Sequence, residues 1–200
     1  MQAEYRWNER HAEILDRYLK ELTKNGVRYF ILRNYEGLPE ENESKDVDLI
    51  IEPGSYKKAS KILIDVFKKM KVPRYYVVKY ERVRCWIGID LDDNFSIHID
   101  LIEGYLNKGF EIFKFNQLYE NTEKYKDYVV LNKPYDIAML LLYKVIASKQ
   151  LKERYIEKIN KIYSESKEQT DDIIRYAMGE KLGNTIIKYL ENGQKRGCYR

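Results

Sequence analysis

Asp46-Val47-Asp48-Leu49-Ile50-Ile51 decides the fold of this chain, because it joins two carboxylates to the apolar run of a buried strand. Alternate side chains of a strand share a face, so Asp46 and Asp48 point to the same side. A second stretch, Ser96-Ile97-His98-Ile99-Asp100-Leu101, places His98 and Asp100 on one face in the same way. If the two strands are neighbours in a sheet, they bring the carboxylates of Asp46, Asp48 and Asp100 together.

Three carboxylates in one place are suited to a divalent metal ion. Mg²⁺ (or Mn²⁺) prefers oxygen ligands and commonly binds one or two carboxylates together with substrate phosphates. Asp46 and Asp48 would hold metal and triphosphate, while Asp100 would bind a second metal ion or accept the proton of an attacking hydroxyl. A plainer interpretation also exists, because Asp is common at turns and strand ends. Asp100 favours the metal site, since a carboxylate in an apolar strand is costly to bury without a partner.

Helical and strand patterns surround these two stretches. Apolar residues at helical spacing predict a helix over residues 9–24, and another with one apolar face after Pro53. Apolar or alternating runs predict further strands over residues 27–32, 74–80, 83–91 and 95–102, with a short helix over 115–121 and a short strand near Tyr128. Four later patterns predict helices over residues 135–150, 152–164, 167–178 and 180–192. We therefore expect an α+β fold, with a mixed sheet packed on helices over residues 1–131 and a helical subdomain over residues 132–200.

The turn Asp92-Asp93-Asn94 predicts a hairpin between the strands over 83–91 and 95–102. Pairing Leu91 with Phe95 across a three-residue loop places the apolar residues of both strands on one face. In this register Trp86 lies opposite Asp100 on the other face. Trp86 would then be either a cross-strand aromatic partner or a surface on which a base or sugar stacks.

Composition limits the class of protein. Hydrophobic residues make up 44% and charged residues 34%, which is typical of a folded globular chain. The net charge of +4 is mild and no basic block is present, which argues against a nucleic-acid partner. No apolar run approaches the roughly 20 residues that span a bilayer, so we expect no membrane insertion and a cytoplasmic location. Oligomeric state is not determined by the sequence.

The order of these motifs resembles the nucleotidyltransferase superfamily, typified by DNA polymerase beta and by the antibiotic and tRNA nucleotidyltransferases. That superfamily has a hydrophobic-Gly-Gly/Ser element, an Asp-x-Asp/Glu about ten residues later, and a third acidic strand. The stretch Tyr29 to Pro39, followed by Lys45 to Ile50, also looks like nucleotidyltransferase-like proteins of polysaccharide biosynthesis clusters. The resemblance covers roughly residues 10–102 and implies a nucleotidyltransferase that binds ATP or another nucleoside triphosphate.

The chain departs from the superfamily where Arg33-Asn34 replaces Gly-Ser. Glycine lets backbone amides approach phosphates, and this cradle is lost here. Arg33 could bind phosphate with its guanidinium fork, or it could pair with Asp46 or Asp48 and leave the site without metal. Further candidates for nucleotide binding are Asn34, His98 and Lys144. His98 has a structural alternative, and Lys144 could instead extend over the edge of the core.

Two functions of different classes follow. In the first, a nucleoside monophosphate is transferred from the triphosphate to a small hydroxyl or amine acceptor, such as a sugar or a surface-glycan precursor. Asp46, Asp48 and Asp100 are then both the metal ligands and the catalytic residues. In the second, the chain is a catalytically inactive binding module or a toxin–antitoxin-type partner, in which Arg33 neutralises the acidic pair.

Overall fold

The computed structural model describes residues 7–42, 44, 46–80, 82–104, 111–143 and 153–192, with the backbone alone at 153 and 154. Contacts divide this part of the chain into two compact units. The first unit contains residues 7–104 and 122–130, and the second contains residues 111–121 and 131–192.

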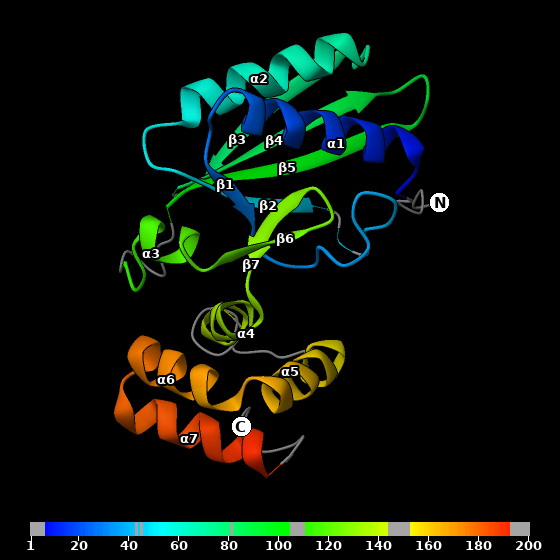
Figure 1. Ribbon diagram of the computed structural model, residues 1–200. Coiled ribbons are helices and arrows are strands. Elements are labelled where there is room, and N and C mark those ends of the chain that lie inside the picture. Colours follow the sequence, from blue (N-terminus) through cyan, green and yellow to red (C-terminus); the bar gives the residue numbers. More distant parts are fainter. Residues whose placement is uncertain are drawn as a thin grey trace. The chain divides into compact units, whose positions relative to one another are not determined.

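A mixed seven-stranded sheet forms the body of the first unit (Figure 1). The strands are β1 (Tyr29–Ile31), β2 (Asp46–Ile51), β3 (Arg74–Tyr80), β4 (Val83–Asp90), β5 (Phe95–Glu103), β6 (Thr122–Tyr125) and β7 (Tyr128–Leu131). Their order across the sheet is β3-β4-β5-β2-β1-β7-β6. Strand β2 runs parallel to β5 and β1 parallel to β7, whereas β1–β2, β3–β4 and β4–β5 are antiparallel. The predicted α+β fold with a mixed sheet on helices is confirmed.

Two helices, α1 (Glu9–Lys24) and α2 (Tyr56–Lys69), lie together on one side of this sheet (Figure 1). Helix α1 begins at Asn8, whose side chain accepts from the His11 N–H while His11 Nδ1 accepts from the Asn8 N–H, a reciprocal cap. The apolar faces of both helices share one core with alternate residues of β2, Val47, Leu49 and Ile51. Because side chains alternate along a strand, Asp46 and Asp48 point away from α1 and α2.

The β4–β5 hairpin corrects the predicted register by one residue. Asp90, and not Leu91, lies opposite Phe95, so the loop has four residues and Asn94 takes the left-handed conformation with φ 48°. The shift exchanges the two faces of β4. Trp86 therefore lies opposite Ile99, 7% exposed in the core beneath the helices, and does not face Asp100.

Close packing of α2 explains this register. At Gly88 an added Cβ would lie 3.1 Å from the Phe67 ring and from Val72, so the position facing the helix needs a residue without a side chain. The predicted register was chosen to place the apolar residues of both strands on one face. That criterion failed because β4 carries apolar residues on both of its faces. Ile87 and Ile89 take the half-buried face that was expected to be polar.

The second unit is helical. Its elements are α3 (Phe115–Tyr119), α4 (Lys133–Leu141), α5 (Glu153–Glu165), α6 (Lys167–Met178) and α7 (Glu180–Glu191). Apolar residues of α4, α5, α6 and α7 form its core, including Ile137, Ile159, Ile174 and Ile187. The helix predicted over residues 135–150 is described as far as Leu141, and residues 144–152 lie outside the described part of the chain. Among the described helices, none is both long enough and apolar enough to cross a membrane.

Candidate metal site

The three predicted carboxylates lie together on the face of the sheet opposite α1 and α2. Strands β2 and β5 are parallel neighbours, with Asp48 opposite Asp100 and Asp46 opposite His98. One oxygen from each of Asp46, Asp48 and Asp100 lies within 4.8 Å of the others. The adjacency of these two strands is what makes one site from residues far apart in sequence.

Asp46 stands at the beginning of β2 and is half-buried. The Ser44 hydroxyl donates to Asp46 Oδ1, and the Asn42 side-chain amide donates to the Asp46 carbonyl at 3.2 Å. Asn42 also accepts from the Ser44 N–H at 2.9 Å. The loop before β2 thus holds Asp46 in place through Ser44 and Asn42.

Asp48 is buried, with 7% of its surface exposed, and pairs with Arg33 just beyond the end of β1. Arg33 Nε and one terminal guanidinium nitrogen each lie 2.8 Å from Asp48 Oδ2. Burial raises the pKa of Asp48 above its ordinary value, Arg33 opposes the rise, and the charges of Asp46 and Asp100 add to it.

Asp100 is 5% exposed and has two differently placed oxygens. The Tyr80 O–H donates to Oδ2 at 2.8 Å. Oδ1 is fully buried and makes no hydrogen bond to the described residues. Cys85 lies directly opposite Asp100 on β4, where burial and the nearby carboxylates, Asp100 first among them, raise the pKa of its thiol to about 12. Burial, followed by the bond to Asp100, also raises the pKa of Tyr80.

The balance of charge in this cluster favours a bound cation. Arg33 pairs with one carboxylate, and within the described ranges no other Lys or Arg lies within ion-pair distance of Asp46, Asp48 or Asp100. Burying carboxylates without compensating charge is costly, and a buried Asp100 Oδ1 without a donor adds to that cost. The ligand atoms are all carboxylate oxygens, the donor set of Mg²⁺ or Mn²⁺. The residues present therefore fit the predicted metal.

The other predicted nucleotide-binding residues have different outcomes. His98 lies on β5 next to Asp46, half-buried and on the acidic face. Asn34 follows Arg33 in a left-handed conformation with φ 55°, which Asn tolerates better than most residues do. Lys144 lies outside the described residues. Their predicted contacts with nucleotide stay predictions.

Three further residues touch the carboxylates and were not predicted: Ser44, Tyr80 and Cys85. Had the hairpin register been predicted as the structure has it, Cys85 would have been placed opposite Asp100. Tyr80 ends a predicted strand, but only the pairing of β3 with β4 brings its hydroxyl to Asp100. Ser44 precedes Asp46 by two residues, and its polar side chain was not distinguishable from ordinary loop composition.

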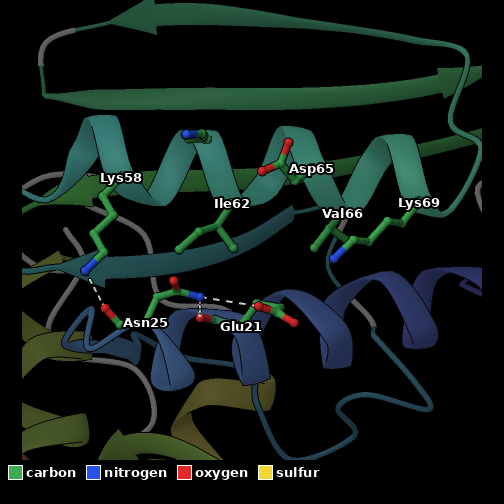
Figure 2. Close-up of a pocket in the computed structure, with 8 residues that line it drawn as sticks. Glu21, Asn25, Lys58, Ile62, Asp65, Val66 and Lys69 are labelled. Carbon is green, nitrogen blue, oxygen red and sulfur yellow. Dashed lines mark hydrogen bonds between the residues drawn. The ribbon is translucent and has the colours of Figure 1, made fainter.

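A shallow groove of about 350 Å³ lies between α1 and α2, on the helix-covered side of the sheet (Figure 2). Figure 2 shows Lys58 reaching Asn25 at the end of α1, where Lys58 Nζ donates to the Asn25 carbonyl. Glu21 accepts from the Asn25 side-chain amide. Acidic and basic side chains are interspersed along the groove. The sheet separates the groove from Asp46, Asp48 and Asp100.

Comparisons with known proteins found solved structures of low similarity to this chain. No protein-family model matches the chain, and no curated protein does. An antigenic nucleotidyltransferase-like protein from Paracoccidioides brasiliensis has a TM-score of 0.45 and 10% identity, over 94% of this chain and 95% of that one. A protein proposed to be a nucleotidyltransferase, from H. pylori, has a TM-score of 0.37 and 11% identity, over 92% and 88%. The polymerase core of TRAMP, an RNA surveillance complex, has a TM-score of 0.31 and 14% identity, over 92% and 55%. The functional proposal therefore rests on the acidic site.

Proposed function

We propose that this chain is a metal-dependent nucleotidyltransferase that transfers a nucleoside monophosphate from a nucleoside triphosphate to a small hydroxyl or amine acceptor. The observation that supports it is the cluster of Asp46, Asp48 and Asp100, with oxygens within 4.8 Å and a single arginine as counter-charge among the described residues. A cation completes that balance, and a triphosphate brings its own oxygens to share the cation.

The carboxylates have separate roles in this proposal. Asp46 and Asp48 hold Mg²⁺ (or Mn²⁺), which supplies neutralisation of the charge on the transferred phosphoryl group. Asp100 would accept the proton of the acceptor hydroxyl through its carboxylate, of which Tyr80 holds one oxygen, Oδ2. The acceptor oxygen then bonds to the α-phosphorus, the bond from that phosphorus to the bridging oxygen breaks, and pyrophosphate leaves.

Arg33 has a different proposed partner in the empty site and in the site that holds metal and triphosphate. In the structure its guanidinium binds Asp48, and we propose that it turns to the triphosphate when a cation takes over Asp48. A guanidinium fits phosphate oxygens as well as carboxylate oxygens, so the exchange conserves its hydrogen bonds. Asn34, His98 and Lys144 are proposed as further nucleotide contacts, and ATP is the proposed nucleotide. The proposed acceptor is a sugar or a surface-glycan precursor, which rests on the sequence resemblance alone.

The ion pair between Arg33 and Asp48 also supports a second candidate function. If the guanidinium stays on Asp48, two carboxylates remain and the site binds triphosphate poorly. The chain would then be a catalytically inactive binding module or a toxin–antitoxin-type partner. The two candidates differ in a measurable way, because only the enzyme needs metal and triphosphate together.

Thermal unfolding of the wild type with each of the four ribonucleoside triphosphates, with and without Mg²⁺, tests the proposal. We expect the triphosphate to raise Tm only when Mg²⁺ is present, because the metal would be held by the carboxylates and the phosphates together. Asp48→Asn keeps the shape of the side chain and removes its charge, so this rise should disappear. Pyrophosphate release in the presence of candidate sugars would then identify the acceptor.

Asp92→Asn is the matched control, since it removes one carboxylate from an exposed turn outside the site. It should keep the full rise in Tm. Equal shifts with and without Mg²⁺, or an undiminished shift in Asp48→Asn, would contradict the metal site. No shift with any triphosphate would favour the binding module.

A further inference from the structure

The two edges of the seven-stranded sheet are built differently. Strand β6 at one edge has four residues and carries Glu123 and Lys124, charges that discourage pairing with another strand. Strand β3 at the other edge has seven residues, Arg74 to Tyr80, and contains no proline. It pairs with β4 through seven consecutive positions without a bulge. Natural sheets rarely leave a long, regular edge of this kind unprotected.

Strand β3 exposes apolar side chains on both faces of the sheet. Tyr76, Val78 and Tyr80 are 48%, 45% and 49% exposed on the acidic face, and Val77 is 44% exposed on the other. All four are among the seven large apolar side chains that are exposed in the described part of the chain. An exposed row of backbone hydrogen-bonding groups flanked by such side chains is the usual template for strand addition.

We propose that β3 pairs with β3 of a second copy of this chain, antiparallel and centred on Val77, so that two sheets join into one. The two-fold axis passes through the Val77 pair, perpendicular to the sheet. Tyr76 then lies opposite the partner's Val78, Tyr75 opposite the partner's Lys79, and Arg74 opposite the partner's Tyr80. All seven residues of the strand are used.

The charges of the strand select a second copy as the partner. Arg74 and Lys79 are its two cations, and the centred register sets each opposite a tyrosine and neither opposite the other. A cation beside an aromatic ring is favourable, whereas like charges directly opposite are not. The two-fold also keeps equivalent faces of the two sheets on the same side, because opposite residues of an antiparallel pair share a face. The sequence Arg-Tyr-Tyr-Val-Val-Lys-Tyr thus complements itself.

Val77 gives a sharp test because the two copies of this residue face each other across the axis. The wild type should behave as a dimer in light scattering at tens of micromolar protein. Val77→Lys and Val77→Glu should each be monomeric. Each variant places two like-charged side chains directly opposite each other, on Cα atoms about 4.5–5.5 Å apart. An equimolar mixture of the two variants should recover the dimer, because opposite charges then meet at the axis.

Lys124→Glu, on the short β6 edge, is the control and should leave the dimer unchanged. Circular dichroism with thermal unfolding checks that each variant is folded, and the exposed position of Val77 permits a charge in the monomer. A monomeric wild type at this concentration would overturn the proposal, as would a dimer that both single variants retain. Monomers that do not recombine on mixing would overturn the Val77-centred register.

Discussion

In the proposed enzyme, Arg33 determines whether Asp48 can bind a metal ion. Its guanidinium is mostly buried and binds the carboxylate of Asp48, which a cation would also bind. Both cations are attracted to the same carboxylate, so Arg33 and Mg²⁺ compete in the proposed enzyme. The balance between them sets how much metal the site needs.

Arg33→Gln should expose this competition. Without metal the variant should be less stable than the wild type by about 2 to 4 kcal/mol, because a buried carboxylate loses its partner. It should also reach half of its Mg²⁺-dependent rise in Tm at a several-fold lower Mg²⁺ concentration. Thermal unfolding across a Mg²⁺ series without nucleotide measures both effects.

Arg28→Gln is the matched control, because Arg28 pairs with Glu52 at a more exposed position. It makes the same change in charge and should leave the Mg²⁺ midpoint unchanged. If Arg33→Gln has the same midpoint as the wild type, Arg33 does not compete for the site. If neither protein responds to Mg²⁺, the binding module is the better account.

The carboxylates were predictable residue by residue, and their neighbours were not. Asp48 and Asp100 interrupt apolar strands, where a charge needs a reason, so the sequence itself marks them. Tyr80 and Cys85 belong to the same cluster but look like ordinary strand residues. Only the pairing of β3, β4 and β5 brings them to Asp100, and cross-strand register depends on packing that one sequence does not contain.

The beginning of α1 gives a pH-dependent element. His11 is buried between Trp7 and Phe95, and its Nε2–H donates to the Ser96 carbonyl at 2.9 Å. Burial, with a smaller contribution from Arg10, lowers the pKa of His11 below its ordinary value of 6.5. The folded protein therefore binds the proton less tightly than the unfolded chain does.

We expect this contribution to stability to be complete above pH 6.5 and to be lost as the pH falls through that value towards the lower pKa of the folded state. Thermal unfolding from pH 8 to pH 5 measures the decline in Tm. His11→Gln can still bond to the N-terminus of the helix but cannot ionise, so its decline should be smaller over this range. Identical slopes for the two proteins would contradict the assignment to His11.

At the scale of elements, length and periodicity carried the prediction. The limits of α1, β3 and α6 follow from apolar spacing and from clear ends, and the structure has them where the sequence predicts them. Strand β6 was missed because Thr122–Tyr125 has four residues and little apolar character. Strand β1 is shorter than predicted, since only Tyr29–Ile31 pair as a regular strand.

The helical unit contains a buried ion pair between two of its helices. Asp136 near the beginning of α4 is 1% exposed, and its carboxylate lies 2.7 Å from Lys158 Nζ on α5. Asp136→Ala should destabilise the protein by about 2 to 3 kcal/mol, because Lys158 loses a charged partner while keeping some access to water. Urea denaturation measures the change in the free energy of unfolding.

The exposed pair between Lys133 and Glu165 is the internal control for this measurement. Glu165→Ala removes a carboxylate from the same two helices at a solvated position and should give no measurable change. Equal effects of Asp136→Ala and Glu165→Ala would show that burial does not set the strength of the Asp136 pair.

The parallel pairing of β1 with β7 has a consequence for how the protein is made. Ile31 pairs with Val130, far along the chain, whereas the carboxylates of β2 and β5 are all present once residue 100 has been synthesised. During translation the acidic cluster can assemble first, while one edge of β1 stays unpaired until β7 has been synthesised. Long-range pairing of this kind slows folding and leaves strand edges open to wrong partners. A nascent chain that stalls between these two points would therefore carry all three carboxylates on a sheet that still lacks β7.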